Sequence, residues 1–76
     1  MNIKKIIGDN IRGFRHKLKW SQEKLAIRAK IHNDYLGRIE RGEQNVGIES
    51  IYKVAKALGI EPYKLWIEGQ YKKAND

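Results

Sequence analysis

Apolar residues recur at helical spacing along the first part of the chain. Their steps of four, four, three and four place them on one stripe of a helix. They are Ile3, Ile7, Ile11, Phe14 and Leu18. The pattern predicts a helix over residues 3–18, in which Gly8 and Gly13 each cost about 1 kcal/mol relative to alanine.

Two shorter helices are predicted next, joined by a tight turn. Ser21 can accept a hydrogen bond from a free backbone N–H, so the first begins at Gln22 and lasts about two turns, to Lys30. The second runs from about Asn33 to Arg41, with His32 at its cap and Gly42 at its end. The inward-facing positions of the pair are Leu25, Ala26, Ala29, Leu36 and Ile39.

The second half of the chain predicts two more helices. Helical spacing returns at Ile48, Ile51, Val54, Ala55 and Leu58, and Gly59 ends that run. Pro62 suits the first position of a short fifth helix, Tyr63 to Ile67, which closes near Gly69. We expect residues 70–76 to be frayed. Because no segment alternates as a strand does, the sequence predicts one all-α domain of five short helices over residues 1–76.

Composition limits the classes of protein that fit this pattern. The 76 residues suit one small domain, and the absence of cysteine excludes disulfides and thiol chemistry. Apolar runs of two or three residues are far shorter than the roughly 20 that cross a bilayer, and the N-terminus lacks a secretory apolar segment, so a soluble cytoplasmic protein is expected.

The positive charge is confined to one half of the chain. The formal charge is +7, and residues 1–41 carry all of it, with eleven basic and four acidic side chains; residues 42–76 carry five of each. A basic surface concentrated in one part of a small domain is typical of contact with the phosphate backbone of a nucleic acid.

The helix-turn-helix over residues 22–41 is the arrangement that lets a second helix enter the major groove of DNA. The stretch SQEKLAIRAKIHNDYLGRIERGEQN, with the later IYKVAKALGI, resembles the Cro and lambda-repressor-like (XRE) family over nearly the whole chain. Within that family, IHNDYLGRIERGEQN most resembles the controller proteins of restriction-modification systems. The resemblance implies a transcriptional regulator, which can act as a repressor, as an activator or as both. This sequence departs from the family at Lys30, where the family usually has glycine.

Base readout is expected from the exposed start and outer face of the second of these helices. The positions that match the family's base contacts are His32, Asn33, Asp34, Tyr35 and Arg38. Arg38 can donate to guanine, Asn33 can pair with adenine, and Asp34 can accept from cytosine. Two alternatives stay open: an exposed ion pair between Asp34 and Arg38, four residues apart, and a packing role for Tyr35.

Phosphate contact and internal support are expected from other positions. By resemblance and by their place at helix ends, the phosphate contacts are Ser21, Gln22, Arg41, Gln44 and Asn45. Further cations that add to the positive electrostatic field around the protein are Arg12, Lys17, Lys19, Lys24 and Arg28. The resemblance also implies a structural ion pair between Arg15 and Glu40.

A single reading helix contacts too few base pairs for selectivity, so we expect a homodimer on a palindromic operator. The reading helices of the two copies should then lie about 34 Å apart, one turn of DNA. Candidate interface residues are Ile60, Tyr63, Trp66, Ile67 and Tyr71. Leu65 and Trp66 are the ones most expected to belong to the core instead.

Other functions fit less well. His16 and His32 have no cysteine or carboxylate pair near them in sequence, and no glycine-rich phosphate loop is present, so we expect no enzyme, no metal, no cofactor and no small-molecule effector. Three alternatives remain: an antitoxin that masks a partner protein, a phage-type repressor, and a basic amphipathic protein on an anionic membrane surface.

Overall fold

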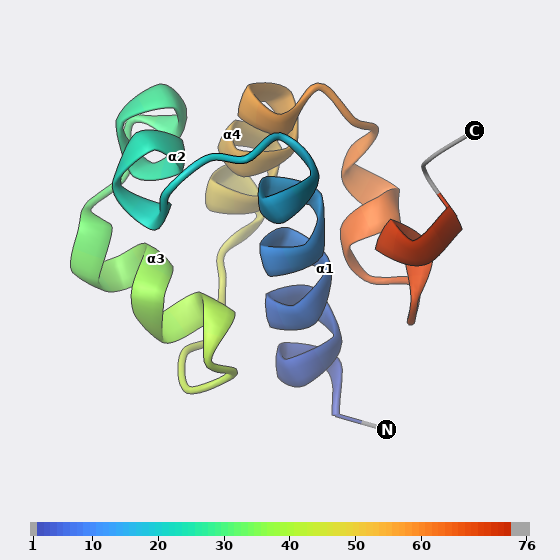
Figure 1. Cartoon of the computed structure of the whole chain (residues 1–76). Coiled ribbons are helices and arrows are strands. Elements are labelled where there is room, and N and C mark those ends of the chain that lie inside the picture. The colour runs from blue at the N-terminus through green and yellow to red at the C-terminus, as the bar shows by residue number, and fades with distance from the viewer. Residues whose placement is uncertain (1, 74–76) are drawn as a thin grey trace.

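The computed structural model describes residues 2–73, which form four α-helices and two short 3₁₀ helices (Figure 1). The α-helices are α1 (Ile3–Lys17), α2 (Gln22–Ala29), α3 (Asn33–Glu40) and α4 (Ile48–Leu58); the 3₁₀ helices are η1 (Pro62–Leu65) and η2 (Gln70–Lys73). No strand forms within residues 2–73, which confirms the all-α prediction. None of the helices in that range is both long and apolar enough to cross a membrane.

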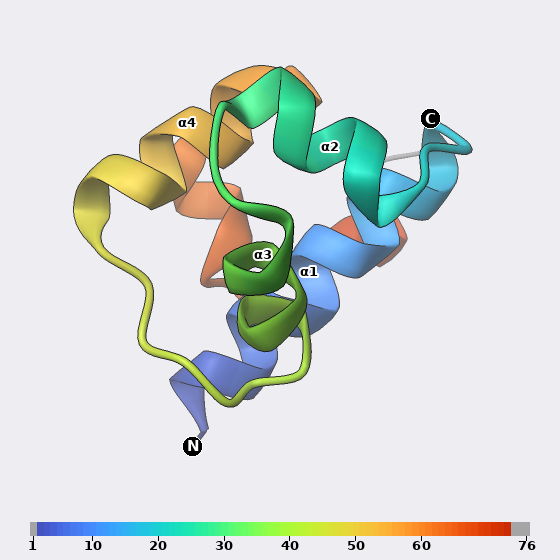
Figure 2. The ribbon, with the colours of Figure 1, turned by 90° about the vertical axis from the view of Figure 1, so that its left-hand side faces the viewer.

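One apolar core holds the four α-helices together. Helix α2 packs against α4, and α3 packs against α1 (Figure 2). The core consists of Ile7, Ile11, Phe14, Leu25, Ala26, Ala29, Leu36, Ile39, Ile51, Val54, Ala55, Leu58 and Leu65. The predicted apolar stripes are wrong only at helix ends: Ile3 and Leu18 are more than 40% exposed and Ile48 is 87% exposed, because these positions extend beyond the helices that would cover them.

The two glycines within α1 mark close approaches of other parts of the chain. A Cβ on Gly8 would lie 2.6 Å from the backbone carbonyl oxygens of Ile39 and Glu40, so only glycine lets the end of α3 pack against α1 here. The ring of Tyr71 covers Gly13 in the same way. The two glycines lower the helix propensity of α1, as predicted, and in return they allow these two close contacts.

The C-terminal segment differs from the prediction. The fifth element is a 3₁₀ helix of four residues, since a segment this short before Gly69 cannot sustain α-helical hydrogen bonding on its own. The expected fraying from residue 70 is wrong for residues 70–73, because η2 packs against α1; residues 74–76 of that expectation lie outside the described residues.

A buried asparagine holds this segment in place. Asn10 is fully buried, and its Nδ2 donates to the carbonyl oxygens of Leu65 (2.8 Å) and Ile67 (2.9 Å). Its Oδ1 accepts from the backbone N–H of Tyr71 at 3.4 Å. One polar side chain of α1 thus binds both 3₁₀ helices, a role that the helical pattern did not reveal.

We expect Asn10→Ala to lower the free energy of unfolding by about 2–3 kcal/mol, because two carbonyl groups and one N–H lose their buried partner. Urea unfolding followed by circular dichroism measures the change. The matched control is Asn45→Ala, an exposed loop position, which should change stability by less than about 0.5 kcal/mol. Equal losses in the two variants would contradict the role given to Asn10.

Candidate nucleic-acid interface

Local groups define both ends of α2 and the start of α3: a cap before α2, a left-handed residue after it and a cap before α3. Ser21 Oγ accepts from the backbone N–H of Lys24 at 3.0 Å and caps α2. Lys30 ends α2 with φ 60° and ψ 44°, the left-handed conformation that costs a non-glycine residue about 1 kcal/mol. His32 Nδ1 accepts from the backbone N–H of Asp34 at 3.2 Å and caps α3. The turn expected around glycine in this family therefore forms here with lysine.

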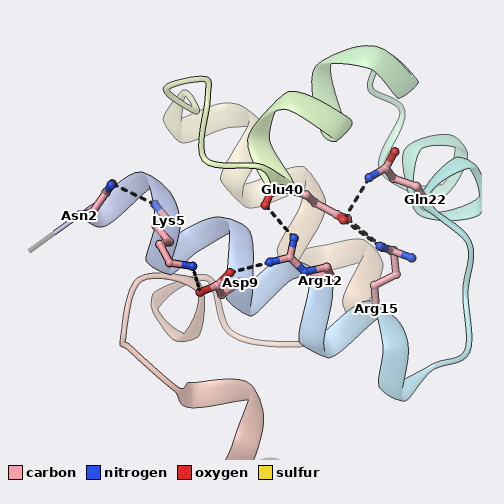
Figure 3. Close-up of polar contacts among 7 residues, drawn as sticks. All are labelled: Asn2, Lys5, Asp9, Arg12, Arg15, Gln22 and Glu40. Carbon is pink, nitrogen blue, oxygen red and sulfur yellow. Dashed lines mark hydrogen bonds and ion pairs between the residues drawn. The ribbon is translucent and has the colours of Figure 1, made fainter.

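A buried ion pair joins α1 to the last residue of α3 (Figure 3). The Arg15 guanidinium donates from Nε to Glu40 Oε2 and from Nη2 to Glu40 Oε1, both at 2.8 Å. The side chains are only 10% and 2% exposed. Nη1 of Arg15 also donates to the carbonyl oxygen of Trp20 at 3.0 Å. This two-bond geometry fixes α3 in angle as well as in distance from α1.

Two further side chains extend this pair into a network across three helices. Arg12 donates from Nη1 to the backbone oxygen of Glu40 at 3.1 Å and pairs with Asp9 at 2.6 Å. Gln22, at the start of α2, donates from Nε2 to Glu40 Oε1 at 3.1 Å. Arg12 was expected only to add charge and Gln22 only to contact phosphate, so sequence reasoning missed their internal partners.

The outer face of α3 carries the residues predicted to read bases. Asn33, Asp34 and Arg38 are exposed on α3, the helix that lies in front of α1 in Figure 2. His32, the capping residue just before α3, is exposed as well. Arg38 Nε donates to Gln44 Oε1 at 3.2 Å, and within the described part of the chain it forms no ion pair with Asp34. The exposed pair kept open as an alternative is therefore absent there.

Tyr35 is half-buried and packs against the core, and its hydroxyl accepts from the backbone N–H of Gly47 at 3.5 Å. The structure thus shows the packing role that was one of its two alternatives. The hydroxyl holds the loop between α3 and α4 close to α3. That loop carries Gln44 and Asn45.

Residues expected to contact phosphate flank α3 on both sides. Ser21, Arg41 and Asn45 are exposed, and Gln44 is half-buried. Arg41 donates to Glu43 at 3.0 Å, and its pKa is raised by that hydrogen bond first, then by attraction to Glu43 and to Asp34. These acidic neighbours therefore favour the cationic form of the Arg41 guanidinium.

Two of the cations expected to add to the positive electrostatic field of the protein lie over an aromatic ring. Lys24 Nζ and the Arg28 guanidinium lie 5.4 Å and 5.2 Å from the centroid of Trp20. Such contacts keep the cations near α2 while their charge still faces solvent.

The predicted dimer residues separate into two groups. Tyr63, Trp66 and Ile67 are each at least 40% exposed and lie close together in sequence around η1. Ile60 and Tyr71 are half-buried and pack against the core. Leu65 is fully buried as expected, but the core expectation for Trp66 is wrong, since Leu65 alone occupies the inner side of η1.

Comparison with known proteins agrees with this geometry. A helix-turn-helix family model matches residues 11–65, which include α2, the turn and α3. The chain belongs to the XRE-type helix-turn-helix family. It is 43% identical over 65 residues to control protein C.BamHI of Bacillus amyloliquefaciens, covering 84% of this chain and 80% of the relative. It is 40% identical over 65 residues to control protein C.SmaI of Serratia marcescens, covering 86% and 77%.

Solved structures show the same fold. The restriction-modification controller protein C.AhdI of Aeromonas hydrophila matches with a TM-score of 0.79 and 39% sequence identity. The match covers 82% of the present chain and 94% of the C.AhdI chain. A hypothetical transcription factor from Neisseria has a TM-score of 0.86 and 33% identity, covering 92% and 80%.

We expect Glu40→Ala to lower the free energy of unfolding by about 3–5 kcal/mol, because Arg15 is left charged and unpaired in the interior. Replacing both partners, Arg15→Met with Glu40→Leu, should recover most of this loss. Thermal and urea unfolding measure both variants.

The matched control is Lys5→Ala, which breaks the exposed Lys5–Asp9 pair and should have little effect. A Glu40→Ala loss no larger than that of the control would contradict the internal role of the pair.

Proposed function

We propose that this XRE-type protein is a sequence-specific transcriptional regulator that binds a palindromic operator as a homodimer and controls a restriction-modification system. The observation that supports this most is the placement of α3: a buried ion pair ties its last residue to α1, and its exposed side carries Asn33, Asp34 and Arg38. The controller proteins that it resembles support the restriction-modification role.

In this proposal Arg38 is the principal base contact. Its side chain is exposed and its hydrogen bond to Gln44 uses only Nε, so the terminal nitrogens remain available to guanine O6 and N7. Asn33 and Asp34, in the first turn of α3, would read adjacent bases. His32 would act mainly through its cap, which sets the direction in which the first turn of α3 points.

Phosphate contacts on either side of α3 would set the register of the protein on the duplex. Ser21 lies at the start of α2, and Arg41, Gln44 and Asn45 follow α3, so the groups are placed to contact backbone on both edges of one major groove. The charge of +7 would make this binding strongly dependent on salt.

The homodimer would form through the exposed apolar residues around η1. Tyr63, Trp66 and Ile67 present three large apolar side chains on a segment that carries none of the proposed DNA contacts. Pairing of two copies there would remove these side chains from water and leave both α3 helices free for DNA.

We expect Arg38→Ala to relax specificity at one base position by about 1–3 kcal/mol. Selection of bound duplexes from a random pool, followed by binding titrations at several salt concentrations, measures this. The matched control is Arg38→Lys, which keeps the charge but loses the two-pronged donor, so it should lose base preference while retaining affinity for random duplex.

If both Arg38 variants weakened binding to all sequences equally, Arg38 would contact phosphate and not a base. If the wild-type protein bound every duplex with equal affinity, the regulator proposal itself would fail, and an antitoxin that masks a protein partner would be favoured.

We expect Trp66→Asp to convert the dimer to a monomer in sedimentation velocity, because two carboxylates would be buried against each other at the interface. Affinity for the full palindrome should fall, while affinity for one half-site should not change. The control is Tyr52→Asp, an exposed aromatic on α4 outside the proposed interface. A dimer that survives Trp66→Asp and dissociates with Tyr52→Asp would place the interface on α4.

A further inference from the structure

Glu43 is an acidic residue among the groups proposed to contact the DNA backbone. In the chain it lies between Arg41 on one side and Gln44 and Asn45 on the other. Its Oε2 accepts from Arg41 Nε at 3.0 Å, and both side chains are more than half exposed. We propose that Glu43 competes with DNA phosphate for the Arg41 guanidinium, and so sets how tightly the protein holds any duplex without changing which sequence it prefers.

The turn that ends α3 brings Glu43 back to the end of that helix. Gly42 has a φ of 75°, in the left-handed region that favours glycine. The N–H of Gly42 donates to the carbonyl oxygen of Ile39 at 3.0 Å. The N–H of Glu43 donates to the carbonyl oxygen of Arg38 at 3.0 Å. This pair of bonds after a helix is the Schellman motif, so the backbone of Glu43 is fixed beside Arg41 before the side chains meet.

Glu43 takes only one of the donors of Arg41. A guanidinium has several N–H groups and no acceptor, and within residues 2–73 only Nε of Arg41 forms a hydrogen bond. A phosphate can therefore bind the two terminal nitrogens while the carboxylate stays on Nε, or it can displace the carboxylate. In the first case two negative charges repel each other across one cation, and in the second the bond to Glu43 is lost. Either way, Glu43 weakens the phosphate contact without blocking it.

Base reading is separate from this contact. The Nε of Arg38 donates to Gln44, a neutral side chain, at 3.2 Å, whereas Glu43 is paired with Arg41. Removing the charge of Glu43 should therefore strengthen backbone contact for every sequence alike and leave the base preference unchanged. The inference rests on the proposed function and adds to it the residue that tunes its overall affinity.

Binding titrations with Glu43→Gln test this. The variant keeps an oxygen that can accept from Arg41 Nε but removes the charge. It should bind the selected operator and a random duplex more tightly, each by about 3- to 10-fold at low salt, and the gain should shrink as salt rises. The matched control is Glu61→Gln, which changes net charge equally at an exposed position outside the proposed DNA contacts and should gain less than about 2-fold.

A double variant separates action through Arg41 from direct repulsion of DNA by Glu43. Since both side chains are exposed, neither replacement should disturb folding. Arg41→Ala alone should weaken binding to both duplexes by the same factor. In that background Glu43→Gln should gain less than about 2-fold. The proposal is overturned if Glu43→Gln gains equally with and without Arg41, if it gains nothing, or if it alters the preferred bases.

Failure of the proposed function would look different. A wild-type protein that binds duplexes but prefers no sequence would contradict the regulator proposal, while titrations on random duplex would still support or overturn the competition. A protein that selects an operator and shows no coupling between Glu43 and Arg41 would overturn this inference alone. No binding to any duplex would overturn both.

Discussion

The Arg15–Glu40 ion pair is the interaction on which the arrangement of this small domain depends. It is placed where α1, the start of α2 and the end of α3 meet, and one carboxylate accepts from both an arginine and a glutamine. Removing one partner would leave the other as an unpaired charge in the interior, which costs about 3–5 kcal/mol in folded proteins. A buried pair of this kind favours one orientation of α3 more than it adds net stability.

With the ion pair in place, α3 has an inner side held by the rest of the domain and an outer side that is free to bind DNA. The inner side of α3 contributes Leu36, Ile39 and Glu40 to the interior, where Gly8 allows the backbone of α1 to approach. The outer side contributes exposed polar residues that need no internal partner. A helix anchored in this way loses little conformational entropy on binding, which favours selectivity between similar sites.

Much of the fold could be predicted from the sequence, because helical spacing and caps are local signals. The limits of α4 and the capping role of Ser21 follow from residues close by in the chain. The roles of Asn10, Gly8 and Gly13 could not be predicted, since each depends on a contact made tens of residues away, with Leu65, Glu40 and Tyr71. The packing of η2 against α1 was missed for the same reason: its polar sequence suggests a free end, whereas the Tyr71 ring packs against the core and its backbone N–H donates to Asn10.

The candidate site was predictable in part. The exposed residues of α3 follow from helical periodicity, because positions opposite Leu36 and Ile39 must face solvent. The pairing of Arg15 with Glu40 came from family resemblance, since two charges 25 residues apart give no local signal. The partners of Arg12 and Gln22 were missed because the sequence gives no sign of whether an arginine or a glutamine near the surface contacts a buried group.

Backbone amide NMR during titration with the selected duplex tests most directly whether the ion pair presents α3 to DNA as a rigid reading element. Large shifts in slow exchange are expected at residues 33–38 and at the phosphate-contact positions Ser21, Arg41, Gln44 and Asn45, with the signals of Ile11, Leu58 and Leu65 almost unmoved. Unshifted α3 signals, or changes spread through the core, would contradict it.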